Sequence, residues 1–290
     1  MAQLEIYQSI WGMEELPWKS STPWSHEEQI DRIAEAGFDG AEIDFVDMDE
    51  ARAFSRLAID RGLRIRALCF PETIGELSEV LETVAEVGAE HVNNINVLPM
   101  AQPLTIAECV PILEGFRDLA DDAGVEMHVE THRASMTNDL LFTVQLLDAV
   151  PWMNLTADLS HYVVARQFPW PIDDTSEQYV QRILARAVAF HGRVATSSQV
   201  QVSLGFPQNK QWLDLFAGWW KAGFRQFRDR APGDARLTFT AELGPPGWFY
   251  AITGPDGLEL SDRWAEALLL KDLARELWAS LDEEPAEIQG

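Results

Sequence analysis

The segment at residues 126–132, EMHVETH, alternates four ionisable side chains with Met, Val and Thr. In an extended strand all four would lie on one face, because successive strand side chains point to opposite faces. They are Glu126, His128, Glu130 and His132. Carboxylates and imidazoles grouped in this way can transfer protons or bind a metal ion. A half-exposed antiparallel strand would explain the same pattern without any chemistry.

Three more residues of these types stand in segments that we expect to be strands. Asp158 comes late in NLTADLSH, His191 comes early in its segment, and Glu242 comes late in LTFTAELG. If they meet Glu130, three carboxylates would repel one another unless they were protonated or bridged by a cation. A divalent cation with oxygen ligands and one nitrogen ligand removes that conflict.

The elements that would position these residues follow a repeated order of amphipathic helix, glycine and apolar strand, as in AEAGFDGAEIDF and DDAGVEMHVET. We expect strands near 4–10, 40–45, 64–70, 91–97, 126–132, 154–160, 190–195 and 236–243. We expect helices near 25–36, 49–62, 74–87, 105–123, 137–149, 177–189, 210–229 and 261–280. Eight such units without a nucleotide-binding glycine fingerprint predict a single (β/α)8 TIM barrel of α/β class over residues 1–290, with a frayed acidic tail at about 281–290.

In such a barrel the carboxyl ends of the strands form one mouth, where active sites lie. Glu130, Asp158, His191 and Glu242 would converge there from four consecutive strands. Bulky apolar side chains normally fill the interior of the barrel, so an inward face of ionisable residues needs a partner that neutralises it.

Composition limits the possible partners. The 290 residues are 47% hydrophobic and carry a formal net charge of −25, which opposes binding to nucleic acid or to anionic lipid surfaces. No basic leader or long apolar stretch is found, so we expect a soluble cytoplasmic protein without membrane association. Cys69 and Cys109 match no metal-binding or redox spacing and are expected to be buried thiols in a reducing compartment.

Taken together, these features resemble the xylose-isomerase-like TIM-barrel superfamily. Its members include sugar isomerases and epimerases, inosose dehydratases, hydroxypyruvate isomerases and apurinic-site endonucleases. The resemblance spans essentially the whole barrel, and its specificity lies in the order and spacing of the motifs. The motifs are AGFDGAEI after the first helix, HVETHR on the fifth strand, DLSH on the sixth, His191 on the seventh and AEL on the eighth.

The resemblance implies one divalent metal ion, with Mn²⁺ the first expectation and Mg²⁺, Co²⁺ or Zn²⁺ compatible. Its implied ligands are Glu130, Asp158, His191 and Glu242. It also implies that His161 and Arg193 hold substrate oxygens. The substrate would be a small carbohydrate whose carbonyl is polarised by the metal. Glu130 and Glu242 would then act as acid and base through a cis-enediolate.

Other residues could shape the substrate site, each with a structural alternative. Trp11 is one of several tryptophans expected near the mouth, where aromatic rings stack on sugars or serve as packing residues and interface anchors. His132 is expected to support the site as a hydrogen-bond donor. The asparagines of HVNNINV either reach the substrate or only pack in the barrel. Glu42 could orient a substrate hydroxyl, or it could form a buried salt bridge with Arg66.

Three classes of function fit these residues. The first is a metal-dependent sugar isomerase or epimerase. The second is a metal-dependent lyase or dehydratase of keto-sugars or oxidised glycosides, because the same enediolate can expel a β-leaving group. The third is a non-catalytic sugar-binding barrel. We expect a homo-oligomer, and endonuclease activity is the least expected because the chain has six histidines and strong negative charge.

Overall fold

Glycines end several of the predicted helices and turn the chain into the next strand. Gly37, Gly62 and Gly124 each adopt a positive φ of 69–73°, which glycine tolerates because it has no Cβ. Helix starts are set just as locally, as at Ser25, which forms a capping box with Glu28. Short-range chemistry of this kind fixes where most helices begin and end.

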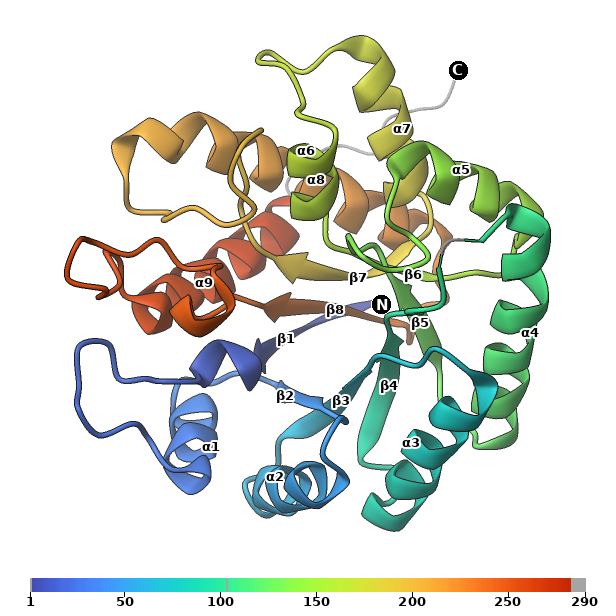
Figure 1. Ribbon diagram of the computed structural model, residues 1–290, viewed down its shortest axis with the longest axis horizontal. Helices are drawn as coiled ribbons and strands as arrows, with labels where there is room; N and C mark the ends of the chain where they lie inside the picture. Colours follow the sequence, from blue (N-terminus) through green and yellow to red (C-terminus); the bar gives the residue numbers. More distant parts are fainter. Residues whose placement is uncertain (1, 103, 283–290) are drawn as a thin grey trace.

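The computed structural model describes residues 2–102 and 104–282. Within these ranges, eight parallel strands close into a barrel in chain order and helices surround it (Figure 1). This confirms the predicted TIM barrel. The strands are β1 (Gln3–Ser9), β2 (Gly40–Asp44), β3 (Arg64–Cys69), β4 (Val92–Val97), β5 (Met127–Glu130), β6 (Leu155–Ala157), β7 (Ala187–Gly192) and β8 (Arg236–Ala241).

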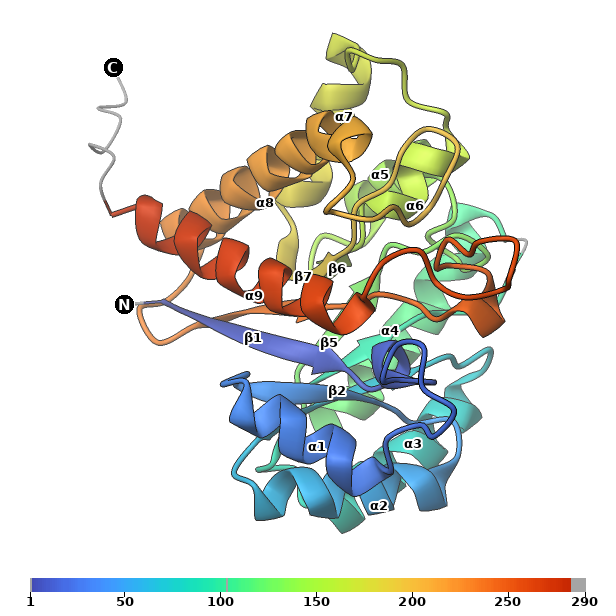
Figure 2. The ribbon, with the colours of Figure 1, turned by 90° about the vertical axis from the view of Figure 1, so that its left-hand side faces the viewer.

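The helices of the described ranges follow the strands along the chain. They are α1 (His26–Glu35), α2 (Met48–Asp60), α3 (Ile74–Val87), α4 (Ile106–Asp122), α5 (Leu140–Ala149), α6 (Ser160–Ala165), α7 (Asp174–Leu184), α8 (Lys210–Arg230) and α9 (Arg263–Ser280), with 3₁₀ turns η1 (Trp11–Met13), η2 (Pro207–Asn209) and η3 (Pro246–Trp248). The loops that follow β1 and β8 extend beyond the carboxyl ends of the strands, on the right of Figure 2.

Several expected strands differ from the structure. The strand expected at 154–160 is β6, which ends at Ala157, so Asp158 follows the strand and Ser160 begins α6. The strand expected at 190–195 is β7, which begins at Ala187, so His191 lies near its end and not early in it. Alanine favours helices, so the sequence pattern extends the preceding helix to residue 189, whereas that helix ends at Leu184. The short helix α6 was not predicted.

The expected strand 126–132 is also shorter, because β5 ends at Glu130, where the Thr137 hydroxyl donates to the Glu130 carbonyl oxygen (2.5 Å). Glu126 and His132 therefore lie outside the strand, and the predicted face of four ionisable residues is wrong. Glu126 is exposed, and its carboxylate lies 3.1 Å from His128 Nε2.

Other expectations concern the thiols, the tail and the membrane. Cys69 and Cys109 are free and buried, as predicted. The tail prediction falls largely outside the described residues, which end at 282. In the described part of the chain, no helix is both long and apolar enough to cross a bilayer.

Candidate active site and metal centre

The four residues predicted to converge do so at the carboxyl mouth of the barrel. Glu130 ends β5, His191 is the penultimate residue of β7, and Asp158 and Glu242 directly follow β6 and β8. Each offers one ligand atom, and these four atoms lie within 4.8 Å of one another. None of the four residues is more than 5% exposed. We call Glu130, Asp158, His191 and Glu242 the quartet.

The quartet carries more negative charge than its neighbours balance. His191 Nδ1 lies 2.7 Å from Glu242 Oε2 and 3.5 Å from Glu130 Oε1. Arg193 pairs with Glu242 and places Nη2 3.1 Å from Asp158 Oδ2. Among the described residues, Arg193 is thus the one permanently charged cation within ion-pair distance of the quartet, and it reaches two of the three carboxylates.

Two ligand atoms of the quartet lack a well-formed hydrogen bond. Asp158 Oδ2 and His191 Nδ1 are buried and make none within the described ranges, although ion-pair partners lie near them. Buried polar atoms without such bonds cost free energy, and a cation would satisfy both. Three carboxylates and one imidazole therefore fit a divalent ion such as Mn²⁺, Mg²⁺, Co²⁺ or Zn²⁺.

The pKa values of the two glutamates move in opposite directions. Burial raises the pKa of Glu130 to about 7, although His191 opposes the shift. Burial also acts to raise the pKa of Glu242, but Arg193 and then His191 outweigh it and hold that pKa below its ordinary value. Burial raises the pKa of Asp158 as well, against the pull of Arg193. Burial acts to lower the pKa of His191, but Glu130 and then Glu242 outweigh it and hold that pKa well above its ordinary value. Glu130 and His191 are therefore the members of the quartet that hold protons most readily in the absence of a cation.

Two histidines lie beside the quartet and have ring nitrogens without a hydrogen bond, although His161 Nε2 is 3.4 Å from Asp158 Oδ2. His161, on α6, is fully buried, and neither of its ring nitrogens makes a hydrogen bond to a described residue. Its ring centroid lies 3.9 Å from that of His132, whose Nδ1 is also unpartnered. Burial lowers the pKa of both, that of His132 to about 4, with Arg193 adding to the shift. Both are therefore neutral imidazoles, able to donate to or accept from a substrate hydroxyl.

An aromatic corner borders Arg193. Trp11 and Tyr250 pack edge to face with ring centroids 4.9 Å apart. The Arg193 guanidinium carbon lies 4.7 Å from the Tyr250 ring centroid and 5.6 Å from that of Trp11. The structure thus places Trp11 beside the site, as predicted. Sequence reasoning missed Tyr250, because its place depends on the course of the loop between β8 and α9.

The second strand contributes two carboxylates, Glu42, which is buried, and Asp44, which is half-buried. Glu42 Oε2 lies 3.4 Å from Arg66 Nη1 and 3.2 Å from His191 Nε2, so the salt bridge proposed as the alternative is present. Asp44 has an unpartnered Oδ1, and burial, with Glu42 adding to it, raises its pKa well above the ordinary value. A role for Glu42 in orienting a substrate hydroxyl stays a prediction.

Asn96 of β4 connects the quartet to the barrel interior. Its Nδ2 donates to Glu130 Oε2 (2.6 Å), and its Oδ1 accepts from the Thr156 hydroxyl (2.7 Å). Thr156 in turn accepts from Arg66. The asparagine-rich run HVNNINV indicated that an asparagine could lie near the site. The contact between Asn96 and Glu130 appears only in the folded barrel.

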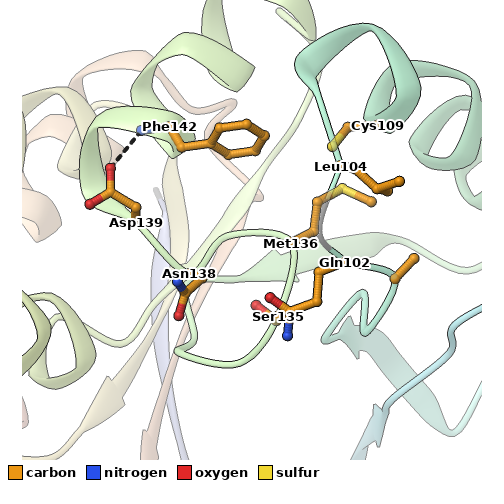
Figure 3. A pocket seen from close by; sticks show the side chains of 9 residues that line it. Gln102, Leu104, Cys109, Ser135, Met136, Asn138, Asp139 and Phe142 are labelled. Carbon is orange, nitrogen blue, oxygen red and sulfur yellow. Dashed lines mark hydrogen bonds between the residues drawn. The ribbon is translucent and has the colours of Figure 1, made fainter.

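A separate cleft of about 190 Å³ opens between the loops that follow β4 and β5 (Figure 3). Its described lining includes Leu104, Cys109, Met136 and Phe142 and no member of the quartet. Asp139 at its edge is engaged as the N-cap of α5. The arrangement of titratable groups, and not this cleft, marks the candidate site.

No protein-family model and no curated protein matches the sequence at a significant level. Solved structures do match across nearly the whole chain. A D-psicose 3-epimerase crystallised with D-fructose aligns with a TM-score of 0.59 and 15% identity, covering 94% of this chain and 99% of the other. A 3-keto-D-glucoside 4-epimerase from E. coli aligns at 0.52 and 15%, covering 95% and 100%.

A third match is a xylose isomerase-like TIM-barrel protein from Mycobacterium smegmatis in complex with magnesium. It aligns with a TM-score of 0.58 and 11% identity, covering 97% of this chain and 98% of the other. Identities this low show the fold and do not transfer an activity. The chain therefore has the fold of the xylose isomerase-like TIM barrels, as the sequence predicted.

Proposed function

We propose that this protein is a divalent-metal-dependent isomerase or epimerase of a sugar or keto-sugar. The observation that carries the proposal is the quartet, whose three carboxylates and one imidazole meet, buried, at the carboxyl mouth of the barrel. The fold shared with sugar epimerases adds support.

The quartet would hold the metal ion, with Mn²⁺ the first candidate. When bound, such an ion supplies a Lewis acid that polarises a substrate carbonyl and acidifies the neighbouring C–H bond. Asp158 and His191 serve this site as ligands, while the two glutamates also handle protons.

Glu130 and Glu242 reach the site from strands separated by β6 and β7, so they can approach a bound carbon from different sides. One carboxylate removes the proton next to the carbonyl and leaves a cis-enediolate. The other returns a proton to the opposite face of that carbon, giving an epimer, or to the adjacent carbon, giving an isomer.

The surrounding side chains orient the substrate and stabilise its developing charge. Arg193 and His161 have unpartnered nitrogens that can donate to the substrate oxygen on which negative charge forms. His132 can bind a further hydroxyl. The Trp11 ring offers an apolar face for the C–H surface of a sugar.

Turnover in D₂O tests this chemistry directly. Metal-loaded protein is incubated with a panel of sugars and keto-glycosides, and the products are separated and examined by NMR and mass spectrometry. We expect solvent deuterium on the carbon next to the carbonyl, because the proton passes through a carboxylate that exchanges with solvent. Chelation should abolish turnover, and restored metal should recover it.

Two results would contradict the proposal: full activity in protein shown by elemental analysis to be metal-free, or product without deuterium under single-turnover conditions. A product that has lost a β-substituent would show that the enediolate expels a leaving group. The protein would then be a lyase, which is the second class of function considered from the sequence.

A further inference from the structure

Arg133 lies at the mouth in the loop after β5, three residues beyond Glu130. Its side chain is partly exposed, and its guanidinium carbon lies 5.2 Å from the Tyr250 ring centroid. Among residues 2–102 and 104–282, no carboxylate lies within ion-pair distance of this guanidinium and no hydrogen bond engages it. Arg133 is therefore a cation beside the candidate site whose charge no described neighbour balances.

Tyr250 joins Arg133 to the rest of the site, because the same ring also contacts Arg193. Arg193 is 1% exposed, yet its Nε and Nη1 make no hydrogen bond to a described residue. His161 Nε2 lies 3.4 Å from Asp158 Oδ2, and neither ring nitrogen of His161 makes a hydrogen bond to a described residue. Hydrogen-bond donors thus gather around the Tyr250 side of the mouth, where a ligand rich in acceptor oxygens would satisfy them.

Hydroxyl groups of a neutral sugar would satisfy these donors but would leave the Arg133 charge uncompensated. A carboxylate or a phosphate accepts two parallel hydrogen bonds from the guanidinium fork and also balances its charge. A protein with a net charge of −25 repels anions at long range, so an anionic substrate needs a local cation at the point of entry. Packing against Tyr250 restricts Arg133, which lowers the entropy lost when a ligand binds.

We infer that Arg133 binds an anionic group of the substrate, so that the enzyme acts on a sugar acid or a sugar phosphate in preference to the neutral sugar. This inference rests on the proposed function for the chemistry at the quartet. It adds a binding subsite formed by Arg133 and Tyr250 for a carboxylate or phosphate remote from the reacting carbon.

Equilibrium binding to the manganese-loaded protein tests the subsite without requiring turnover. Isothermal titration compares D-glucose with D-glucuronate and with D-glucose 6-phosphate, so that the two charged arms distinguish a carboxylate from a phosphate. Hydrogen bonds to charged groups predict that at least one anion binds about 10- to 100-fold more tightly than glucose. Arg133→Gln should remove most of that preference.

Two further variants separate recognition from bulk charge. Arg133→Lys keeps the charge but lacks the planar fork, so it should retain only part of the preference. Arg56→Gln removes one positive charge from an exposed site on the outer helix α2 and should leave the preference as in the wild type. If Arg56→Gln reduces the preference as much as Arg133→Gln does, long-range charge and not a subsite is responsible.

The inference is overturned if neither anion binds more tightly than glucose to the wild type, or if Arg133→Gln keeps the full preference. These results are distinct from failure of the proposed function. If an anion binds through Arg133 but no sugar is turned over with deuterium incorporation, the subsite stands and the proposed isomerase is refuted. Turnover of neutral sugars with deuterium incorporation, but without any preference for anions, would support the isomerase and refute the subsite.

Discussion

Two groups of buried ionisable residues adjoin each other inside this barrel. In the interior, Arg66 and Glu42 are fully buried and form one ion pair of 3.4 Å. Arg66 also donates to Thr156 and to Thr240 (3.3 Å), although its Nε and Glu42 Oε1 remain without partners. At the mouth, Arg193 pairs with Asp158 and Glu242, and no permanent cation of the described chain pairs with Glu130.

The difference lies in the balance of charge. The interior pair matches one cation with one anion, so its charges balance within the barrel. The quartet has an excess of anions that only protonation or an added cation can remove. His191 joins the two groups, with Nε2 near Glu42 and Nδ1 near Glu242. An unbalanced buried cluster beside a balanced one therefore identifies the site more clearly than burial alone.

The largest effect should come from the two glutamates at the mouth. Glu130→Gln and Glu242→Gln keep an oxygen at each position but remove the base, so kcat should fall about 10²–10⁴-fold. Each variant is assayed at saturating metal with occupancy measured, because an amide binds cations less well than a carboxylate. Glu266→Gln, at a buried carboxylate that binds Ser203 and Leu204 and no member of the quartet, is the control. Near-normal turnover by both site variants would refute the two-glutamate mechanism.

The interior pair should show its effect in stability. Arg66→Met leaves Glu42 buried without its cation, and we expect a loss of about 3–5 kcal/mol in the free energy of unfolding measured with urea. The double variant Arg66→Met/Glu42→Gln removes the stranded charge and should recover much of the loss. A loss below about 1 kcal/mol, the scale of an exposed pair, would show that the interior layer does not depend on this pair.

Metal bound at the quartet should raise the free energy of unfolding of the protein. At a free Mn²⁺ concentration of about 100 times Kd, the free energy of unfolding should rise by about 2.7 kcal/mol, because the ion binds the folded chain. Asp158→Asn and His191→Ala should lose most of this rise at the same concentration while remaining folded. A variant that keeps wild-type metal affinity would not have lost a ligand.

The smallest predicted effect is the dependence of metal affinity on pH. A cation binds the ionised form of Glu130, whose pKa in the folded protein is raised to about 7. As the pH falls below about 7, the proton on Glu130 competes with the metal, and this group alone should lower the affinity by up to about tenfold per pH unit. Titrations with Mn²⁺ at pH 6 and pH 8 measure the difference. Equal affinity at the two pH values would show that Glu130 is ionised before the metal binds.

The sequence by itself determined the barrel and the members of the quartet. Helix caps and glycines such as Gly37 act over a few residues, so the order of helix and strand can be read from local pattern. Glu130 and Glu242 stand at strand ends, and strand ends meet at one mouth once the barrel closes. The same local reasoning failed at Ala187–Ala189, where helix propensity and strand burial disagree and packing decided.

Only the tertiary structure decided which side chains surround the quartet. Asn96 reaches Glu130, and Glu42 meets both Arg66 and His191, through contacts that span 24 to 149 residues of sequence. Tyr250 contacts Arg133 and Arg193 only because the loop after β8 folds over the mouth. Contacts of this kind depend on strand register and rotamers fixed by barrel closure, and no local spacing in the sequence encodes them.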